Sequence, residues 1–441
     1  MNRLWATLGV TISVLGFSAS AITAEPLRAA IAADYTAELA GLFTHLHSNP
    51  ELSHREFATA KLLAAELREL GYEVTEGVGE TGIVAVLENG AGPTVMLRAD
   101  MDGLPIEERS GLSYASTARQ VDMNGQDQPV MHACGHDVHM TALIGAAKQL
   151  AARTDAWSGT LVLIGQPAEE RVSGARAMLA DGLYERFPKP DYALAFHVGA
   201  EQASGTIKVP LGITYSSVDS VDMVVHGVGA HGASPHKGID PVLIAAQIVV
   251  TLQSIVSRNL NPLEPGVITV GAIHGGTKHN IIGDRVDMQL TVRSDSVATR
   301  ELLLYSIDRV AEGVARSFGV PESLLPEVIR SKTETSPPII NDEPTARRIK
   351  DAFIAHFGDE IVVDPPRDGM AAEDFAFLVA PELGVKGVYF RVGGTPAAEV
   401  KTAPSHHSAL FKIEPEPAIK TGVEAMVIGA LTLFSSRTSA R

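Results

Sequence analysis

Short apolar runs alternate with helical patterns through the first half of the chain and again near its end. The runs have the length of buried strands, and the segments between them repeat apolar residues at helical spacing. The expected strands cover residues 83–87, 94–98, 160–164, 192–198 and 387–392. The expected helices cover 35–71 (broken near Asn49 and Pro50), 140–152, 175–180 and 418–434. This order predicts an α/β domain whose mostly parallel sheet is covered on both faces.

The pattern changes near residue 214. A strand at 217–226, a strongly apolar helix at 241–257, strands at 267–274 and 285–294, and a helix at 300–318 follow one another. The order strand–helix–strand–strand–helix is typical of a ferredoxin-like α+β unit. A chain of 441 residues also exceeds one ordinary core. We therefore expect an inserted domain over 214–327 within a larger domain made of 25–213 and 328–441.

The first residues have a pattern of their own. Arg3 precedes an apolar, uncharged run over 4–21, and small residues follow up to Ala24. This layout predicts a secretory signal peptide over 1–24, and an uncleaved membrane anchor is the alternative. We expect no later segment to be long and apolar enough to span a bilayer. The protein is thus expected to be exported, periplasmic or secreted, without stable membrane insertion.

The charge of the chain limits its possible partners, and its cysteine content limits its covalent links. The chain has 36 basic and 52 acidic residues and a net charge of −16, which repels phosphate backbones and disfavours nucleic acid. Its single cysteine, Cys134, excludes an intramolecular disulfide. A lone thiol in an oxidising compartment needs protection, and coordination to a metal would provide it.

The densest polar cluster runs from His132 to His139. It contains Cys134 and His136, and a thiolate and an imidazole are ligands that a borderline-soft divalent ion prefers. The helix expected from Met140 would lower the pKa of the thiol and favour the thiolate. The alternative is a helix-capping turn with incidental histidines.

Further polar residues follow three expected strands. Glu169 and Glu170 come after one strand, His197 ends another, and Asp100 and Asp102 follow a third. Taken singly, the glutamates could be solvated and the histidine packed in a core. The carboxyl ends of parallel strands meet at one edge of a sheet, however, where ligands bind. One glutamate can then bind metal while the other faces the water that the metal activates, so the convergence predicts a metal site.

Several ordered motifs resemble one known family over nearly the whole mature chain. The chain is similar to the metal-dependent aminoacylase/carboxypeptidase superfamily, in particular the amidohydrolase branch with hippurate hydrolases and auxin–amino-acid conjugate hydrolases. The motifs that carry the resemblance are 47–52 (HSNPEL), 97–105 (LRADMDGLP), the Cys134 cluster, the Glu169–Glu170 pair, 196–198 (FHV), 229–236 (GAHGASPH), 369–375 (GMAAEDF) and 406–408 (HHS).

The resemblance implies a two-metal centre. The implied ligands are Cys134, His136, Glu170, His197 and His407, with His406 competing with His407 for the last place. A thiolate ligand favours zinc, and manganese, cobalt and nickel are the other metals of the family. Glu169 is the implied general base.

The resemblance also assigns roles in the inserted domain. His231 would stabilise the oxyanion, and Asn280 and Arg293 would contact the substrate. The domain would act as a lid and form the interface of a homodimer. Two positions depart from the family pattern: Gly283 and Ala409 stand where proline is usual. The first puts the shape of the lid loop in doubt, and the second weakens the assignment of His407.

The expected function is hydrolysis of the amide bond of an N-acyl amino acid or a short peptide by a metal-activated water. A dipeptidase or carboxypeptidase of the same family is an alternative. Cys134 as a nucleophile is a rival, disfavoured because His136 is too close in sequence and no third orienting residue is evident. A non-catalytic exported metal- or ligand-binding protein is another, disfavoured because such a protein needs no base beside Glu170.

Overall fold

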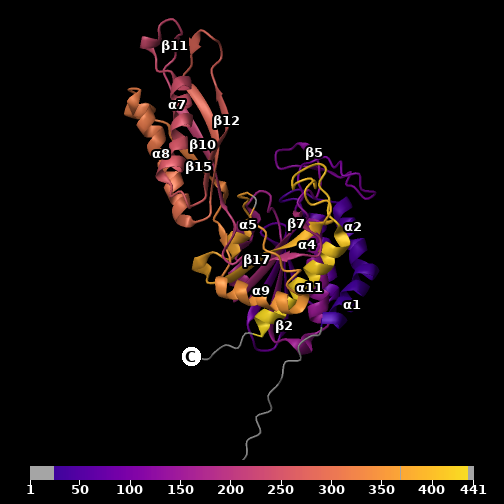
Figure 1. The fold of residues 1–441 in the computed structure, drawn as a ribbon. Helices are drawn as coiled ribbons and strands as arrows, with labels where there is room; N and C mark the ends of the chain where they lie inside the picture. The colour runs from indigo at the N-terminus through magenta and orange to yellow at the C-terminus, as the bar shows by residue number, and fades with distance from the viewer. Residues whose placement is uncertain (1–23, 368, 436–441) are drawn as a thin grey trace, which may run out of the picture.

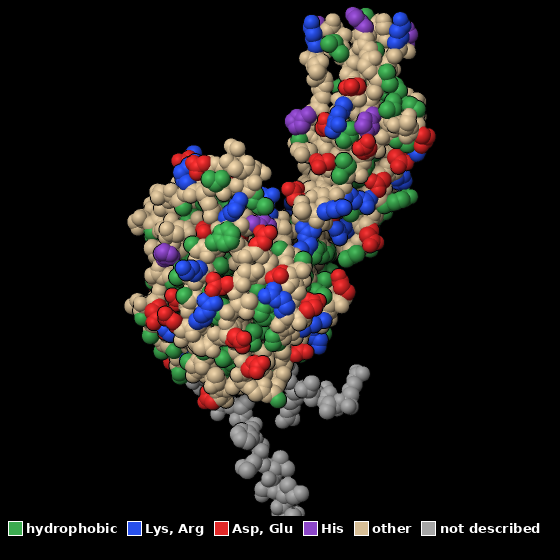
Figure 2. Space-filling view, turned by 180° about the vertical axis from the view of Figure 1, so that it is seen from behind, with side chains coloured by type: hydrophobic (Ala, Val, Ile, Leu, Met, Phe, Trp, Pro, Cys, Tyr) green, Lys and Arg blue, Asp and Glu red, His purple; other side chains and the backbone are tan. Residues whose placement is uncertain are grey.

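The computed structural model describes residues 24–367 and 369–435. The chain forms two bodies: a rounded domain around a large sheet, and an elongated domain that projects from it (Figure 1). We call them the catalytic domain and the lid domain, after the roles that the resemblance implies. The predicted signal peptide lies outside the described residues except for Ala24, where the first helix begins. Charged side chains of both signs are spread over both bodies in Figure 2.

The sheet of the catalytic domain has seven strands, and the prediction of a mostly parallel core is confirmed. The four central strands, β6, β3, β7 and β17, are parallel, and the edge strands are antiparallel. All four central strands therefore end at the same edge of the sheet. In sheet order the strands are β1 (Glu73–Val78), β2 (Gly82–Asn89), β6 (Gly159–Gln166), β3 (Thr94–Asp100), β7 (Tyr192–Ala203), β17 (Lys386–Thr395) and β8 (Ile207–Lys208).

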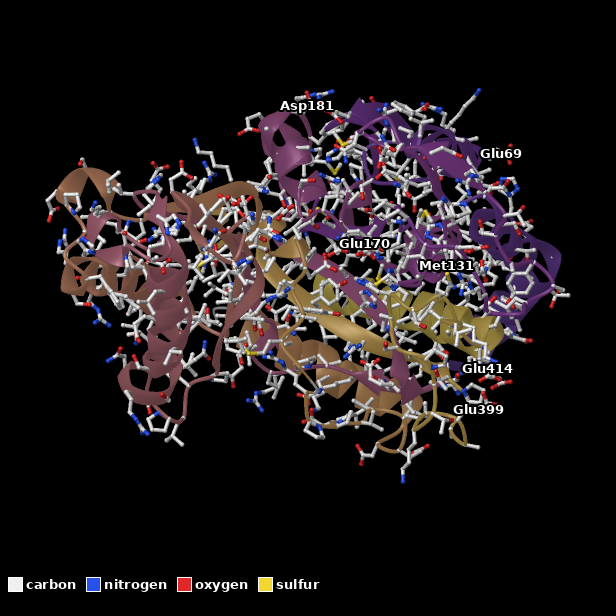
Figure 3. All side chains as sticks on the ribbon, turned by 90° about the horizontal axis from the view of Figure 1, so that it is seen from above. Glu69, Met131, Glu170, Asp181, Glu399 and Glu414 are labelled. Carbon is white, nitrogen blue, oxygen red and sulfur yellow. The ribbon has the colours of Figure 1, made fainter. Side chains whose placement is uncertain are left out.

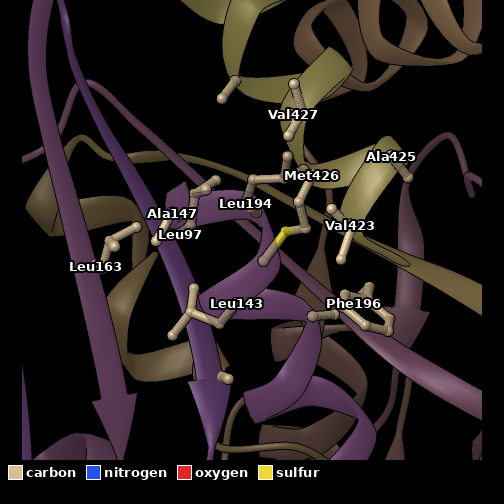
Figure 4. Close-up of a cluster of buried hydrophobic side chains, with 14 of the residues drawn as sticks. Leu97, Leu143, Ala147, Leu163, Leu194, Phe196, Val423, Ala425, Met426 and Val427 are labelled. Atoms are coloured by element: carbon tan, nitrogen blue, oxygen red, sulfur yellow. The ribbon is translucent and has the colours of Figure 1, made fainter. Parts of the chain in front are cut away.

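Helices cover both faces of this sheet. One face packs on α1 (Ala24–Asp34), α2 (Ala40–Ser48), α3 (Phe57–Glu69), α4 (His136–Ala151), α9 (Glu343–Phe357) and α11 (Pro415–Phe434). The other packs on α5 (Gly174–Ala180), α6 (Leu183–Arg186) and α10 (Phe375–Leu378). Figure 4 shows Leu97, Leu163 and Leu194 of the sheet against Leu143 of α4 and Met426 of α11.

Helix α4 begins at His136, four residues before the start that the sequence predicts. The spacing of apolar residues did not predict this first turn, because His136, Asp137 and His139 are polar and yet buried. The remaining short elements of this domain are η1 (Tyr35–Leu39), β4 (Arg119–Val121), β5 (Asp127–Pro129), η2 (Thr154–Ala156), β9 (Ile213–Tyr215), β16 (Ile339–Ile340) and η6 (Pro381–Leu383).

The lid domain is a four-stranded antiparallel sheet with two long helices on one face and a core of its own. The sheet order is β12 (Gly266–Gly275), β14 (Arg285–Ser294), β10 (Ser217–His226) and β15 (Glu327–Ser336). The helices are α7 (Pro241–Ser254), continued by η4 (Ile255–Asn259), and α8 (Val297–Ser317), and the short elements are β11 (Ala230–His231), η3 (Pro235–Lys237), β13 (Ile281–Ile282) and η5 (Glu322–Leu324). Because β15 pairs with β10, the lid sheet continues past residue 327 and completes the ferredoxin-like order.

The two connections between the domains run side by side. Strand β9 precedes the lid, β16 follows it, and the two pair with each other as an antiparallel ribbon. The lid is therefore an insertion whose entry and exit lie together.

Two described helices have the length and apolar composition of a membrane span, so the expectation that none would is wrong. They cover Pro241–Asn259 and Pro415–Phe434. The second lies in the catalytic core, where 72% of its apolar window is buried. The first belongs to the lid, and only 33% of its window is buried, which leaves an apolar helix face uncovered in a single chain.

Candidate metal centre

A cavity of about 600 Å³ opens at the carboxyl edge of the parallel strands. It is lined by Cys134 from the turn before α4, Glu170 from the loop after β6, His197 on β7 itself, and Arg293 from the lid. In Figure 3, Glu170 lies near the middle of the catalytic domain seen from above. The sheet topology thus brings together the polar residues that the sequence places at separate strand ends.

Cys134 and His136 flank a glycine that shapes the turn before α4. Gly135 has φ of 89°, a left-handed conformation that glycine adopts without steric cost. A Cβ at this position would lie 2.3 Å from Cγ1 of Val198, so a larger residue would collide with β7. The turn can therefore pack closely against the strand that carries His197, whose Nε2 lies 3.4 Å from the Cys134 sulfur.

Backbone contacts select the ring nitrogens that face the centre. Nδ1 of His136 lies 2.8 Å from the carbonyl oxygen of Asp102, and Nδ1 of His197 lies 2.7 Å from that of Val198. A carbonyl can only accept, so each Nδ1 carries the proton and each Nε2 keeps its lone pair. Both rings thus present Nε2 as a ligand, in the manner of histidines that bind metal.

Two buried atoms at the centre lack a hydrogen-bond partner within the described part of the chain. They are Nε2 of His136 and Oε1 of Glu170, which lie 3.9 Å apart. A lone-pair nitrogen and a carboxylate oxygen left unpaired in the interior would be costly without a cation. Together with the Cys134 sulfur their ligand atoms lie within 4.8 Å of one another. The donor set therefore fits a divalent cation.

The thiol itself needs such a cation. The sequence predicts that the N-terminus of α4 lowers the pKa of Cys134, and this prediction is wrong. Burial raises the pKa of the thiol well above its ordinary value, and the charges of Glu170 and Glu169 raise it further. The same effect opposes Cys134 as an independent nucleophile, although His197 lies within reach as a base. A cation would reverse this balance and favour the thiolate.

Glu169 and Glu170 are held by a carboxylate beneath them. Their backbone N–H groups donate to the side chain of Asp102 at 3.0 and 3.1 Å. Ala168 just before them has φ of 48°, a strained value for a residue other than glycine, and its N–H donates to Glu56. Asp102 therefore positions the pair. Burial raises the pKa of Glu169, and the neighbouring charge of Glu373 raises it further.

Both of the consecutive histidines reach the cavity. Nε2 of His407 lies 3.2 Å from Oε2 of Glu170, and its side chain is 54% exposed. Nδ1 of His406 lies 3.7 Å from the Cys134 sulfur, and His406 belongs to a group with Cys134 and His197 that does not include Glu170. His407 has φ of 62°, and this kink turns the two neighbouring rings toward different parts of the site.

The structure brings only one of the three predicted lid residues to the cavity. Arg293 lines it, and Nη1 of this residue donates to the carbonyl of Met370. His231 and Asn280 lie at the far tip of the lid, where β11 pairs with β13 and the N–H of Gly232 donates to the Asn280 carbonyl (Figure 1). Gly283 follows this pair, and a Cβ there would meet no atom within 4 Å.

Several buried charges around the centre were missed by sequence reasoning. Arg98 is fully buried and ion-paired with Asp100, Glu373 and Asp374. The motif at 369–375 contains Glu373 and Asp374, but the resemblance assigned no role to either of them. Glu201 and Arg391 form an ion pair in the cavity wall, and no local pattern marks either of them. Burial would raise the pKa of Glu201, but His406 and Arg391 lower it to about 2.

The comparisons with known proteins agree with this geometry. Residues 96–428 match the model of the peptidase family M20/M25/M40. The chain belongs to this family. As an M20 family member it is a hydrolase of amide bonds, and the predictions of the family, the fold and the enzyme class are confirmed.

The relatives of this M20 family protein include enzymes with small substrates. It is 37% identical over 346 residues to a hippurate hydrolase from Campylobacter jejuni, covering 78% of this chain and 86% of the relative. It is 37% identical over 343 residues to an N-acetyl-L-cysteine deacetylase from Bacillus subtilis, covering 78% and 77%. A solved dinuclear metal-binding M20 peptidase from Bacillus subtilis superposes with a TM-score of 0.72 at 26% identity, covering 92% of this chain and 99% of that one.

Proposed function

We propose that this M20 family protein hydrolyses the amide bond of N-acyl amino acids, with Glu169 as the general base. The observation that carries the proposal is the position of a buried carboxyl of raised pKa beside the candidate ligands: Oε2 of Glu169 lies 3.9 Å from Nε2 of His136. The hippurate hydrolase and deacetylase relatives support the class of substrate.

Two divalent cations would be held by Cys134, His136, Glu170, His197 and His407. Zinc is favoured by the thiolate and imidazoles, and manganese, cobalt and nickel are the alternatives. When bound, the cations would polarise the substrate carbonyl and lower the pKa of a water.

The side chains supply the remaining steps. Glu169 accepts a proton from the attacking water and passes it to the leaving amine, a transfer that its raised pKa suits. Arg293 faces the cavity, where its guanidinium can bind the free carboxylate of the amino acid through two parallel hydrogen bonds.

The test is amine release from N-acetyl, N-benzoyl and indole-acetyl amino acids and from dipeptides. We expect the metal-loaded protein to be active, the chelated protein to be inactive, and Glu169→Gln to lose about 10²- to 10⁴-fold in kcat while binding the same amount of metal. The exposed Glu399→Gln is the matched control and should retain activity.

The outcomes separate the alternatives. Cleavage of dipeptides in preference to acyl amino acids would favour a dipeptidase or carboxypeptidase. Tight metal binding without cleavage of any amide would favour a binding protein. Activity that survives chelation and disappears in Cys134→Ala would contradict the metal mechanism.

We also propose that the protein is a homodimer in which each lid serves the other copy. Helix α7 exposes Val242, Leu243 and Val250 at 46%, 55% and 67%, an apolar face suited to pack on its own copy. A partner's lid tip could then bring His231 and Asn280 to the cavity, which they do not approach in a single chain.

Mixing two inactive variants tests this arrangement. Glu169→Gln and His231→Ala should each have little activity, and a mixture of them should regain roughly a quarter of the wild-type rate if His231 acts in the partner's site. A mixture that stays inactive while co-purification of two differently tagged variants shows mixed dimers would contradict the proposal.

Export is a further proposal, supported by the signal-peptide pattern over residues 1–24. Cell fractionation and the mass of the mature protein would test it. We expect protein outside the cytoplasmic membrane that lacks these residues, and a full-length cytoplasmic protein would contradict the proposal.

A further inference from the structure

Three side chains form a row from the cavity wall to the candidate metal centre. Arg391 on β17 forms an ion pair with Oε1 of Glu201. Oε2 of Glu201 lies 3.6 Å from Nε2 of His406, and Nδ1 of His406 lies 3.7 Å from the Cys134 sulfur. Each member therefore contacts the next, and the row ends where His197 also reaches the thiol.

The spacing at the end of this row matches a metal site. Nδ1 of His406 and Nε2 of His197 lie 3.7 and 3.4 Å from the sulfur, and the three ligand atoms lie within 4.8 Å of one another. A tetrahedral zinc ion with bonds of about 2.3 Å to sulfur and about 2.1 Å to nitrogen would hold sulfur and nitrogen about 3.6 Å apart. The observed distances lie on either side of this value.

Two groups meet the outer nitrogen of His406. The N–H of Ala200 points at Nε2 from 3.2 Å, and the Glu201 carboxylate approaches it at 3.6 Å. In this structure the Ala200 N–H donates to Nε2. A cation bound at Nδ1 would place the proton of the neutral ring on Nε2, so Ala200 would lose this acceptor and the Nε2–H would donate to Glu201 instead. Histidines that bind metal commonly donate their other N–H to a carboxylate in this way. Arg391 fixes the carboxylate in turn.

We propose that His406 is a metal ligand together with Cys134 and His197, and that Glu201 is the residue that positions its ring. The inference rests on the two-cation centre of the proposed function. His407, which contacts Glu170, remains a ligand, so the two consecutive histidines bind different cations rather than compete for one.

The arrangement assigns different roles to the two cations. One would be held by three protein ligands, Cys134, His197 and His406, the number that leaves a fourth position open for substrate in catalytic zinc sites. The other would be held by His136, Glu170 and His407, and Cys134 belongs to both groups of candidate ligands.

The test is titration of the chelated protein with cobalt(II). The bound ions are counted by elemental analysis, and visible absorption reports the coordination of each. We expect two ions in the wild type, one of which is weakened at least about 10-fold in His406→Ala. Glu201→Gln, which keeps the shape of the side chain, should weaken the same ion about 10- to 100-fold and alter its visible bands. The thiolate-to-cobalt absorption of Cys134 should remain in both variants.

Matched variants control for non-specific effects. His45→Ala and Glu399→Gln change an exposed histidine and an exposed glutamate of the same domain and should bind cobalt as the wild type does. Circular dichroism checks that each variant is folded, and His406→Asn replaces His406→Ala if the smaller side chain prevents folding.

Binding of both ions by folded His406→Ala or His406→Asn, with wild-type affinity and spectrum, would overturn the inference. If the variants give that result but the wild type cleaves amides, the proposed function still stands. If the wild type cleaves no amide but loses one cobalt site on substitution of His406, the ligand assignment stands and the proposed function fails.

Discussion

The two domains of this M20 family protein differ in how many charged side chains they bury. The catalytic domain buries a charged network beneath its cavity, in which Arg98, Asp100, Glu373 and Asp374 are each at most 1% exposed. The core of the lid consists of apolar side chains, and Arg300 and Asp219 form an ion pair at its margin. The contrast indicates that several charges are buried together where polar atoms must be held in a fixed geometry, whereas the lid buries the Asp219 carboxylate in an ion pair with a partly exposed arginine.

Of the substitutions that test this contrast, Arg98→Met should lower the free energy of unfolding the most. The substitution removes the guanidinium that neutralises Asp100, Glu373 and Asp374 and leaves the three carboxyls buried together. Breaking a buried ion pair in this way costs about 3–5 kcal/mol. We expect a fall of this size in the free energy of unfolding of the catalytic domain, measured by urea titration. A loss below about 1 kcal/mol would show that the network is not needed for stability.

His47→Gln should have an intermediate effect that depends on pH. Burial lowers the pKa of His47, but hydrogen bonds and charges of Asp137 and Glu108 outweigh it and raise the pKa to about 10. Because the folded pKa lies above the unfolded value of about 6.5, the stabilisation is complete below about pH 6.5 and is lost as the pH rises through 10.

The measurement compares the urea unfolding of wild type and His47→Gln at several pH values. We expect a difference of about 2 kcal/mol at pH 6 that shrinks steadily toward pH 10. A difference independent of pH would mean that His47 contributes by packing and not by charge.

Arg300→Met in the lid should have the smallest effect. Its guanidinium makes two hydrogen bonds to Asp219, but the side chain is 25% exposed, so water can replace the lost contacts. We expect a loss of about 1 kcal/mol in the free energy of unfolding of the lid, and thermal unfolding would measure it. A loss as large as that of Arg98→Met would remove the contrast between the domains.

Local pattern was sufficient to predict most of the fold. The strand at 192–198 and the helix at 418–434 were predicted because each is a largely apolar run, and most of these residues are buried. The start of α4 was missed because polar residues there are buried for chemistry and not for packing. The predicted α+β order of the lid lacked β15, because its strand over 327–336 is mostly polar and largely exposed.

The candidate site could be predicted where a local pattern or motif marks its residues. Glu169 follows the end of β6, and Cys134 stands in the polar cluster before α4. His197 belongs to a motif, but it lies within β7 and not at the strand end that the sequence predicts. Glu201 and Arg391 meet because β7 and β17 pair in parallel, a contact between residues far apart in the chain that no local motif reports. The resemblance assigned His231 a role at the reaction centre, but no motif specifies where the tip of the lid lies relative to the cavity.

The paired strands β9 and β16 give the lid the mechanics of a lever. Both attachments lie together at its base, so a rotation about this ribbon moves each lid residue in proportion to its distance from it. Arg293 is close to the base, next to the pairing of Ser217 with Ser294, whereas His231 is at the tip. The same small rotation would therefore leave Arg293 nearly in place while it carries His231 through a long arc.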